Sequence, residues 1–327
     1  MPPTDTSTNS QPASLEELVS RFRRGDRLAL ARLVSLVARG VQIGPILASV
    51  GPTARPARVV ALTGAGGVGK STLVGKLIET IRERALRVAV LACDPESPLT
   101  GGALLGDRFR MPSRPDDEGV FIRSLAAAGG HGALADHLDA LTRLLEAFGF
   151  DVVLIETVGA GQGDTAVLQL VDVLVLLVQP ETGDDLQWEK AGLLEVADVV
   201  VVHKADLPGA DRVEAQVLSI LGLSAGHVPP VIRVSARGGT GLNELWDLIA
   251  ALPLRRERET AERVLLRLGQ EALANRLASL RKANDAALEQ LVKRWRDGDM
   301  SPSEAGQALL DLLTASTRES GPTAADG

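Results

Sequence analysis

The chain has 327 residues, enough for one sizeable α/β domain with flanking helices, because a single hydrophobic core usually stops growing at roughly 250 to 300 residues. Lys and Arg total 35 against 42 Asp and Glu, so the formal net charge is −7, and no block of like charges stands out. With an aromatic content of only 2%, this acidic balance disfavours a nucleic-acid partner, which would need a basic surface or stacking side chains.

Cysteine use and the composition of the N-terminus indicate the compartment. Cys93 is the only cysteine, which excludes an internal disulfide and fits a reducing cytoplasm. The first residues are polar, with no apolar core behind a basic start, and apolar runs such as 173–178 are too short to span a bilayer. We therefore expect a cytoplasmic protein with no export signal and no membrane anchor.

Two short helices are predicted ahead of the main domain, after a disordered tail over residues 1–13. Ser14 and Glu17 form an S-x-x-E capping box at the first helix, and Asp26 can cap the second. The stretch 51–56 then holds two prolines and a glycine, which disfavour regular structure and predict a linker. Residues 14–55 are accordingly assigned to N-terminal helices and a linker.

The pattern from residue 56 to residue 253 is that of an α/β domain. Short runs rich in β-branched residues alternate with amphipathic stretches, and such runs are typical of strands buried on both faces. The expected strands are 59–63, 88–93, 152–155, 173–178, 199–202 and 231–234, and the expected helices are 72–84, 133–148, 212–221 and 242–252. Repeated βαβ units of this kind predict a largely parallel sheet flanked by helices.

Residues 254–317 are expected to form a C-terminal helical arm, followed by a disordered tail over 318–327. One long charged helix is predicted from Glu262 to Trp295, and Gly298 can end it. Ser301, Pro302 and Glu304 then start a short helix. An apolar stripe recurs along the arm at Leu273, Leu277, Leu280, Leu288 and Leu291. Such a face must be covered, either by the chain's own main domain or by the same arm of a second chain.

The strongest motif lies between the first expected strand and the first helix after it. Residues 64–71, G-A-G-G-V-G-K-S, fit G-x-x-x-x-G-K-[ST], the phosphate loop of the P-loop NTPase fold class. Its glycines would let backbone N–H groups approach phosphates, Lys70 would offer a charge to the β and γ groups, and Ser71 could ligate Mg²⁺. A plain glycine turn is the alternative, but the strand before the motif and the helix after it favour nucleotide binding.

Two carboxylates follow expected strands. Asp94 ends the second expected strand and Glu156 the third, so a parallel sheet would bring both to the edge that holds the phosphate loop. Mg²⁺ prefers such oxygen ligands, although each residue could instead be a helix cap or a solvated loop charge. Gly159 comes shortly afterwards, where a backbone N–H could bind the γ-phosphate and sense hydrolysis.

A base-binding motif follows the fifth expected strand. His203-Lys204-Ala205-Asp206 resembles the N-K-x-D motif of GTPases, with His in place of Asn. A carboxylate at Asp206 can accept from guanine N1–H and the 2-amino group, whereas adenine presents an acceptor at N1. A charged turn is the alternative. Ser235 and Ala236, after the last strand, lie where a second base-contacting loop is expected, which favours guanine binding.

Together these segments resemble the MeaB/ArgK family of P-loop GTPases, accessory proteins of adenosylcobalamin-dependent acyl-CoA mutases such as methylmalonyl-CoA mutase. The resemblance rests above all on residues 94–111 and 156–164, which are similar to the first and second switch segments of that family. This chain departs from the family pattern at Glu96, Pro98, Asp164 and His203. The match covers nearly the whole chain.

The resemblance implies a GTP-hydrolysing chaperone that loads or protects the cobalamin of a mutase, a homodimer joined through the arm, and a third mobile loop at 181–190. It implies a catalytic set of Lys70, Asp94, Asp107 and Glu156, and a Mg²⁺ site of Ser71, Asp94, Asp107 and Glu156. The expected GTP/GDP contacts are Gly64, Gly66, Gly67, Val68, Gly69, Lys70, Ser71, Thr72, Gly159, His203, Lys204, Asp206, Ser235 and Ala236. Gln162 follows Gly159 by three residues, so it is not assigned to positioning the water.

Three other functions fit the residues less well than this one. A kinase acting on a transport binding protein would need an acceptor site and a base, and only the switch carboxylates are candidates. A nickel-type metallochaperone GTPase would need clustered His or Cys, whereas the four histidines are scattered. A dimeric scaffold with a silent nucleotide site is disfavoured by intact Lys70 and Ser71. No D-x-H-x-x-G motif is present, so a cobalamin site of the chain's own is not expected.

Overall fold

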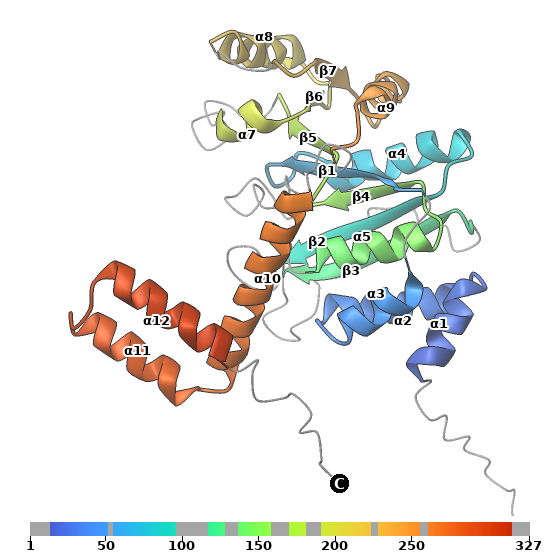
Figure 1. Ribbon diagram of the computed structural model, residues 1–327. Coiled ribbons are helices and arrows are strands. Elements are labelled where there is room, and N and C mark those ends of the chain that lie inside the picture. Colours follow the sequence, from blue (N-terminus) through green and yellow to red (C-terminus); the bar gives the residue numbers. More distant parts are fainter. Residues whose placement is uncertain are drawn as a thin grey trace, which may run out of the picture. The chain divides into compact units, whose positions relative to one another are not determined.

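The computed structural model describes residues 14–51, 55–95, 117–127, 137–157, 170–180, 191–223, 228–255 and 261–315. The chain divides into two compact units, residues 1–257 and residues 258–327 (Figure 1). The predicted tails at 1–13 and 318–327 lie outside the described residues, as does the predicted third mobile loop at 181–190. In the part of the chain that the structure describes, no helix has both the length and the apolar character to cross a membrane.

The first unit is built on a parallel sheet of seven described strands in the order β3-β2-β4-β1-β5-β6-β7. The strands are β1 Arg58–Gly64, β2 Val88–Pro95, β3 Val120–Ala127, β4 Val152–Glu156, β5 Val173–Val178, β6 Val199–His203 and β7 Val231–Val234. The predicted parallel sheet is confirmed, but the sequence predicted six strands and missed β3. Arg123 and Ser124 interrupt this edge strand, whose residues 122–125 are only half-buried, so no continuous apolar run marks it.

Two apolar layers cover the two faces of the sheet. Alternate residues of β1 belong to different clusters, with Val59 and Ala61 in one and Val60 and Leu62 in the other. The first cluster is completed by helices α1, α2, α3, α5, α7 and α8, and the second by α4 and α9 (Figure 1). Because both faces are buried, the central strands need apolar residues on both, which explains why their apolar residues run continuously instead of alternating.

The helices of this unit are α1 Leu15–Arg23, α2 Arg27–Ala38, α3 Ile43–Val50, α4 Lys70–Glu83, α5 Leu138–Ala147, α7 Ala191–Val196, α8 Ala210–Leu221 and α9 Leu242–Ala251. The predicted caps are confirmed: Ser14 Oγ accepts from Glu17 N at 3.2 Å, and Asp26 Oδ1 from Leu28 N at 2.8 Å. The sequence predicted only two helices ahead of the main domain and missed α3, which contains Pro45. Proline is tolerated there because it lies in the first turn, where its missing N–H costs no hydrogen bond.

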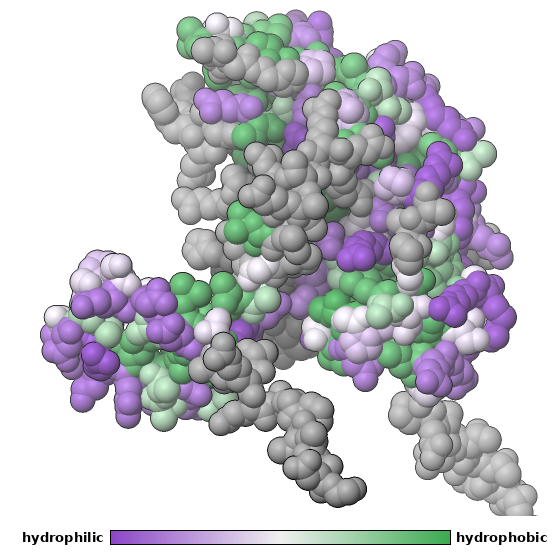
Figure 2. Space-filling view, in the orientation of Figure 1, coloured by the Kyte–Doolittle hydropathy of each residue, from purple (hydrophilic) through white to green (hydrophobic). Residues whose placement is uncertain are grey.

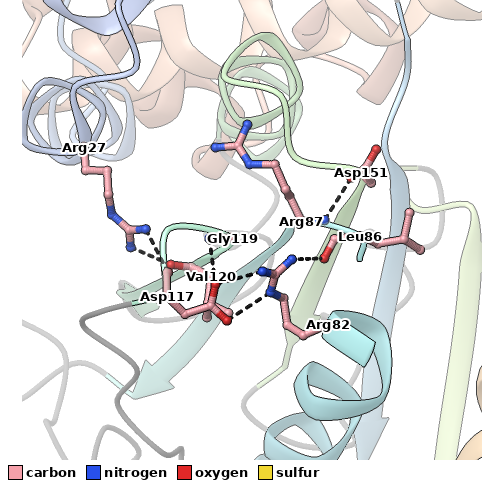
Figure 3. A network of polar contacts seen from close by, with 8 residues as sticks. All are labelled: Arg27, Arg82, Leu86, Arg87, Asp117, Gly119, Val120 and Asp151. Atoms are coloured by element: carbon pink, nitrogen blue, oxygen red, sulfur yellow. Dashed lines mark hydrogen bonds and ion pairs between the residues drawn. The ribbon is translucent and has the colours of Figure 1, made fainter. Parts of the chain in front are cut away.

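One ion pair and several hydrogen bonds fix the start of β3 (Figure 3). Arg82 of α4 makes two bonds to the Asp117 carboxylate, Nε to Oδ2 at 3.0 Å and Nη2 to Oδ1 at 2.9 Å. Arg27 of α2 donates to the Asp117 carbonyl at 3.0 Å, and Gly119 N donates to Asp117 Oδ1 at 2.9 Å. This edge strand is therefore joined to helices on both faces of the sheet by polar contacts that hydrophobic periodicity cannot predict.

The second unit contains helices α10 Ala261–Lys282, α11 Ala286–Arg296 and α12 Pro302–Ala315. The predicted single helix from Glu262 to Trp295 is wrong. Asn284 has a left-handed φ of 49°, and Asp285 Oδ1 caps α11 by accepting from Ala287 N at 3.0 Å. The predicted capping box at the start of α12 is confirmed, since Ser301 N donates to Glu304 Oε2 at 2.8 Å.

Candidate nucleotide site

The expected site residues converge on the carboxyl edge of the sheet. Gly64 at the end of β1 lies opposite Leu177 of β5, and Glu156 at the end of β4 lies opposite Leu62 of β1. His203 ends β6 opposite Val234 of β7. Since all these strands are parallel, the segments that follow them emerge on the same side, as expected for a ligand site in an open α/β sheet.

The phosphate loop joins β1 to α4 and depends on three left-handed glycines. Gly64, Gly67 and Gly69 have φ values of 150°, 75° and 97°, which residues with a Cβ rarely adopt. A Cβ at Gly64 would lie 2.5 Å from the Leu177 carbonyl oxygen, whereas a Cβ at Gly66 or Gly67 would meet no atom within 4 Å. The loop therefore packs tightly where it leaves the sheet and is open around Gly66 and Gly67.

Lys70 and the first turn of α4 supply positive potential to this loop. Lys70 is buried, and its Nζ donates to the carbonyl oxygens of Gly64 at 2.9 Å and Ala65 at 3.2 Å. Helix α4 has 14 residues and begins directly after Gly69, so the N–H groups of its first turn and its dipole favour an anion here. Thr72, also expected to contact nucleotide, is exposed in the same turn.

Ser71 and Glu156 form a buried pair of oxygen donors. The Ser71 hydroxyl donates to Glu156 Oε1 at 2.6 Å, and the two residues are 5% and 3% exposed. A hydroxyl and a carboxylate this close together match the hard oxygen donors that Mg²⁺ prefers. Asp94 lies on the neighbouring strand β2, where only its backbone is described, while Asp107 and Gly159 lie outside the described residues. The metal and switch roles of these three residues stay predictions.

The two base-binding loops are joined to each other. Ser235 Oγ donates to Asp206 Oδ1 at 2.6 Å and accepts from Gly238 N at 2.9 Å. The Ser235 hydrogen bond, with smaller help from the backbone, lowers the pKa of the Asp206 carboxyl and keeps it ionised. Ala236 is buried beside Ser235, and Lys204 has a left-handed φ of 56°. An exposed, ionised carboxylate fixed by a buried hydroxyl can accept two hydrogen bonds from a guanine edge.

His203 occupies a different place from the other predicted base contacts. Its ring is buried, and Nδ1 lies 2.7 Å from the Val68 carbonyl oxygen of the phosphate loop. Burial is the main cause that lowers the pKa of His203, so the ring is neutral at neutral pH. The motif gave no signal of this contact, because 135 positions separate the two residues. The backbone pair between Ser235 and Thr240, which closes the second loop, was also missed.

Comparison with known proteins decides the family. Residues 30–282 match the sequence profile described as "Methylmalonyl Co-A mutase-associated GTPase MeaB". The chain belongs to the MeaB family of GTPases. It is 36% identical over 255 residues to the GTPase ArgK of Escherichia coli, covering 72% of this chain and 75% of that protein. A mouse protein named methylmalonic aciduria type A homolog is 37% identical over 270 residues, covering 77% of this chain and 64% of that one.

A solved structure agrees with the fold of this MeaB GTPase. A structure titled LAO/AO transport system kinase has a TM-score of 0.61 at 24% identity and covers 94% of this chain and 99% of its own. That likeness concerns the fold alone. The profile match and the relatives named as GTPases confirm the predicted family and the GTPase activity. The solved structure confirms the predicted fold class.

Proposed function

We propose that this MeaB-family GTPase is a chaperone that couples its nucleotide state to the loading, or the protection, of adenosylcobalamin on an acyl-CoA mutase. The observation that supports this most strongly is the match of residues 30–282 to a family described as mutase-associated. That match includes both segments that resemble switches, 94–111 and 156–164. The name of the mouse relative, which refers to methylmalonic aciduria, is consistent with a client of the same kind.

Each residue of the nucleotide site would have a defined role in GTP hydrolysis. Lys70 and the N–H groups at the start of α4 would bind the β- and γ-phosphates and stabilise charge that develops on them. Mg²⁺, held by Ser71 and Glu156 with Asp94 and Asp107, would neutralise the phosphate oxygens. The backbone N–H of Gly159 would donate to the γ-phosphate, so the second switch segment would respond to whether that phosphate is present.

Guanine would be bound between the two joined loops. Asp206 would accept from N1–H and the 2-amino group, with its carboxylate held ionised and oriented by Ser235. Lys204, in its left-handed conformation, and buried Ala236 would flank the base. Adenine would place an acceptor against the Asp206 carboxylate, which is unfavourable.

Partner binding tests the proposal directly. The chain, loaded with GDP or with a non-hydrolysable GTP analogue, is mixed with purified candidate mutases, and complexes are measured by calorimetry and size-exclusion chromatography. We expect one mutase to bind with an affinity that depends on the nucleotide and to change the GTP turnover rate. Lys70→Ala should lose the nucleotide dependence. Failure of every adenosylcobalamin-dependent mutase of the source organism to bind would refute the chaperone function while leaving the GTPase activity intact.

A second experiment separates the proposal from a kinase that acts on a transport binding protein. GTP or ATP labelled at the γ-phosphate is incubated with the chain and with candidate acceptor proteins. We expect the label to appear as free phosphate. Label on a protein side chain would support the kinase instead, and stoichiometric nickel binding by the purified chain would support a metallochaperone.

We also propose that two chains pair through the second unit. Figure 2 shows apolar residues among charged ones on the unit formed by α10, α11 and α12. Val292, Trp295 and Leu310 are 45%, 46% and 45% exposed there. A two-fold contact between such units would cover apolar side chains that single chains leave in water.

A further inference from the structure

The side chain of His203, the histidine at the first position of the base motif, contacts the phosphate loop in two ways. His203 Nδ1 lies 2.7 Å from the Val68 carbonyl oxygen. A carbonyl can only accept, so Nδ1 must carry the proton and donate. Nε2 of the neutral ring is then an acceptor, and within the described part of the chain it has no hydrogen-bond partner.

The second contact is steric. A Cβ at Gly69 would lie 2.6 Å from His203 Cε1 and 2.7 Å from Nδ1, so the ring packs directly on the Gly69 backbone. His203 is only 3% exposed, which leaves the ring little room to turn away. The imidazole therefore fixes the two residues that come immediately before Lys70.

His203 is equally well fixed to the base side of the site. It is the last residue of β6 and pairs with Val234 of β7. Two residues later, Ala205 N donates to the Val234 carbonyl at 3.2 Å, and Asp206 is held by Ser235. One side chain thus connects the loop expected to bind phosphates with the loop expected to bind the base.

The tautomer argues against base recognition by the ring itself. On its N7 and O6 edge, guanine presents only acceptors. The one ring nitrogen not used by Val68 is also an acceptor, so it offers nothing to that edge. The donors of guanine, N1–H and the 2-amino group, are those that Asp206 suits.

We propose that His203 is a positioning residue that holds the phosphate loop and the base loop at a fixed separation, and that it does not select the base. The inference concerns the GTPase site alone and does not depend on a mutase partner. It predicts that loss of the Nδ1 donor weakens every nucleotide by the same factor, whatever its base.

Affinities of GDP and IDP test this, because IDP differs only by the missing 2-amino group. In His203→Ala we expect both affinities to fall about tenfold, as when one buried hydrogen bond is lost, with their ratio unchanged. His203→Asn, which keeps a side-chain N–H donor, should recover most of the loss. Asp206→Asn should instead change the ratio of the two affinities.

A matched control separates positioning from general loss of stability. Val202→Ala removes fully buried volume from the adjacent position of the same strand and should lower the thermal stability without a comparable loss of GDP affinity. Should His203→Ala fail to fold, His203→Leu fills the space without a donor and must show the same loss. Unchanged GDP affinity without the donor, a changed GDP to IDP ratio, or an equal loss in Val202→Ala would each overturn the proposal.

Discussion

Substitution of Gly69 gives the sharpest test of how the phosphate loop is held. In Gly69→Ala the new methyl would lie 2.6 Å from His203 Cε1, and the ring cannot turn aside without breaking its hydrogen bond to Val68. Overpacking of this kind costs about 1 to 3 kcal/mol. The left-handed φ of 97° adds about 1 to 2 kcal/mol for any residue with a Cβ. We therefore expect the free energy of unfolding of the nucleotide-free protein to fall by about 2 to 5 kcal/mol.

Gly67→Ala is the matched control, because its φ of 75° is also left-handed but no atom lies within 4 Å of the new Cβ. It should cost only the backbone part, about 1 to 2 kcal/mol. Urea denaturation of both variants measures the difference, and the double variant Gly69→Ala/His203→Ala should lose the excess that comes from the ring. Equal losses in the two glycine variants, or an excess that persists without the imidazole, would refute the packing of His203 on Gly69.

Three further predictions concern the chemistry of the site. Lys70→Ala should lower GTP turnover at least about 100-fold with an unchanged circular dichroism spectrum. Lys76→Ala, at a half-buried position of the same helix, should not lower it, and parent-like turnover in Lys70→Ala would refute the phosphate site. Asp206→Asn should reduce the preference for GTP over ATP seen by calorimetry, whereas equal affinity of the parent for both nucleotides would exclude guanine recognition. The pKa of His203 is lowered mainly by burial and further by Lys204, against the Val68 hydrogen bond and Asp206. Below about pH 6.5 the unfolded chain therefore binds a proton at His203 that the folded chain does not. The free energy of unfolding should fall on acidification by up to about 1.4 kcal/mol per pH unit, and His203→Asn should remove this contribution.

The parts of the fold that the sequence predicted are those set by local pattern. Short runs rich in β-branched residues marked six of the strands, and cap residues such as Ser14, Asp26 and Ser301 marked helix starts. The missed elements depend on tertiary contacts. Strand β3 is fixed at its start by Arg82 and Arg27 around Asp117, and polar pairs between distant segments leave no periodic signal.

The candidate site likewise contains residues that the sequence could place and a contact that only the structure shows. Lys70, Ser71 and Glu156 could be placed together from the sequence, because parallel strands bring their carboxyl ends to one edge. The motif identified His203 as a departure from asparagine but could not say what its ring contacts. Only the structure shows that it faces Val68 and Gly69, since this depends on the distance between two loops rather than on spacing along the chain.

The apolar stripe of the C-terminal unit yields a sharper dimer test than the sequence alone allowed. Leu288 is only 9% exposed and Leu280 only 7%, and α12 packs against both α10 and α11. These two leucines are therefore internal to the unit, and an aspartate at Leu288 would place an unpaired charge in its core. Leu277 is half-buried, and Trp295 is 46% exposed.

A variant designed to be monomeric should therefore carry its substitutions at residues on the outside of the unit. We expect Leu277→Asp with Trp295→Asp to give a monomer by light scattering that keeps its helical content and its affinity for GDP, because the changed side chains are not internal to the unit. Leu288→Asp, the matched control, should lose helical content first and become monomeric only as a consequence. A parent protein that is monomeric at all concentrations would refute the homodimer. A double variant that stays dimeric would place the contact on another surface.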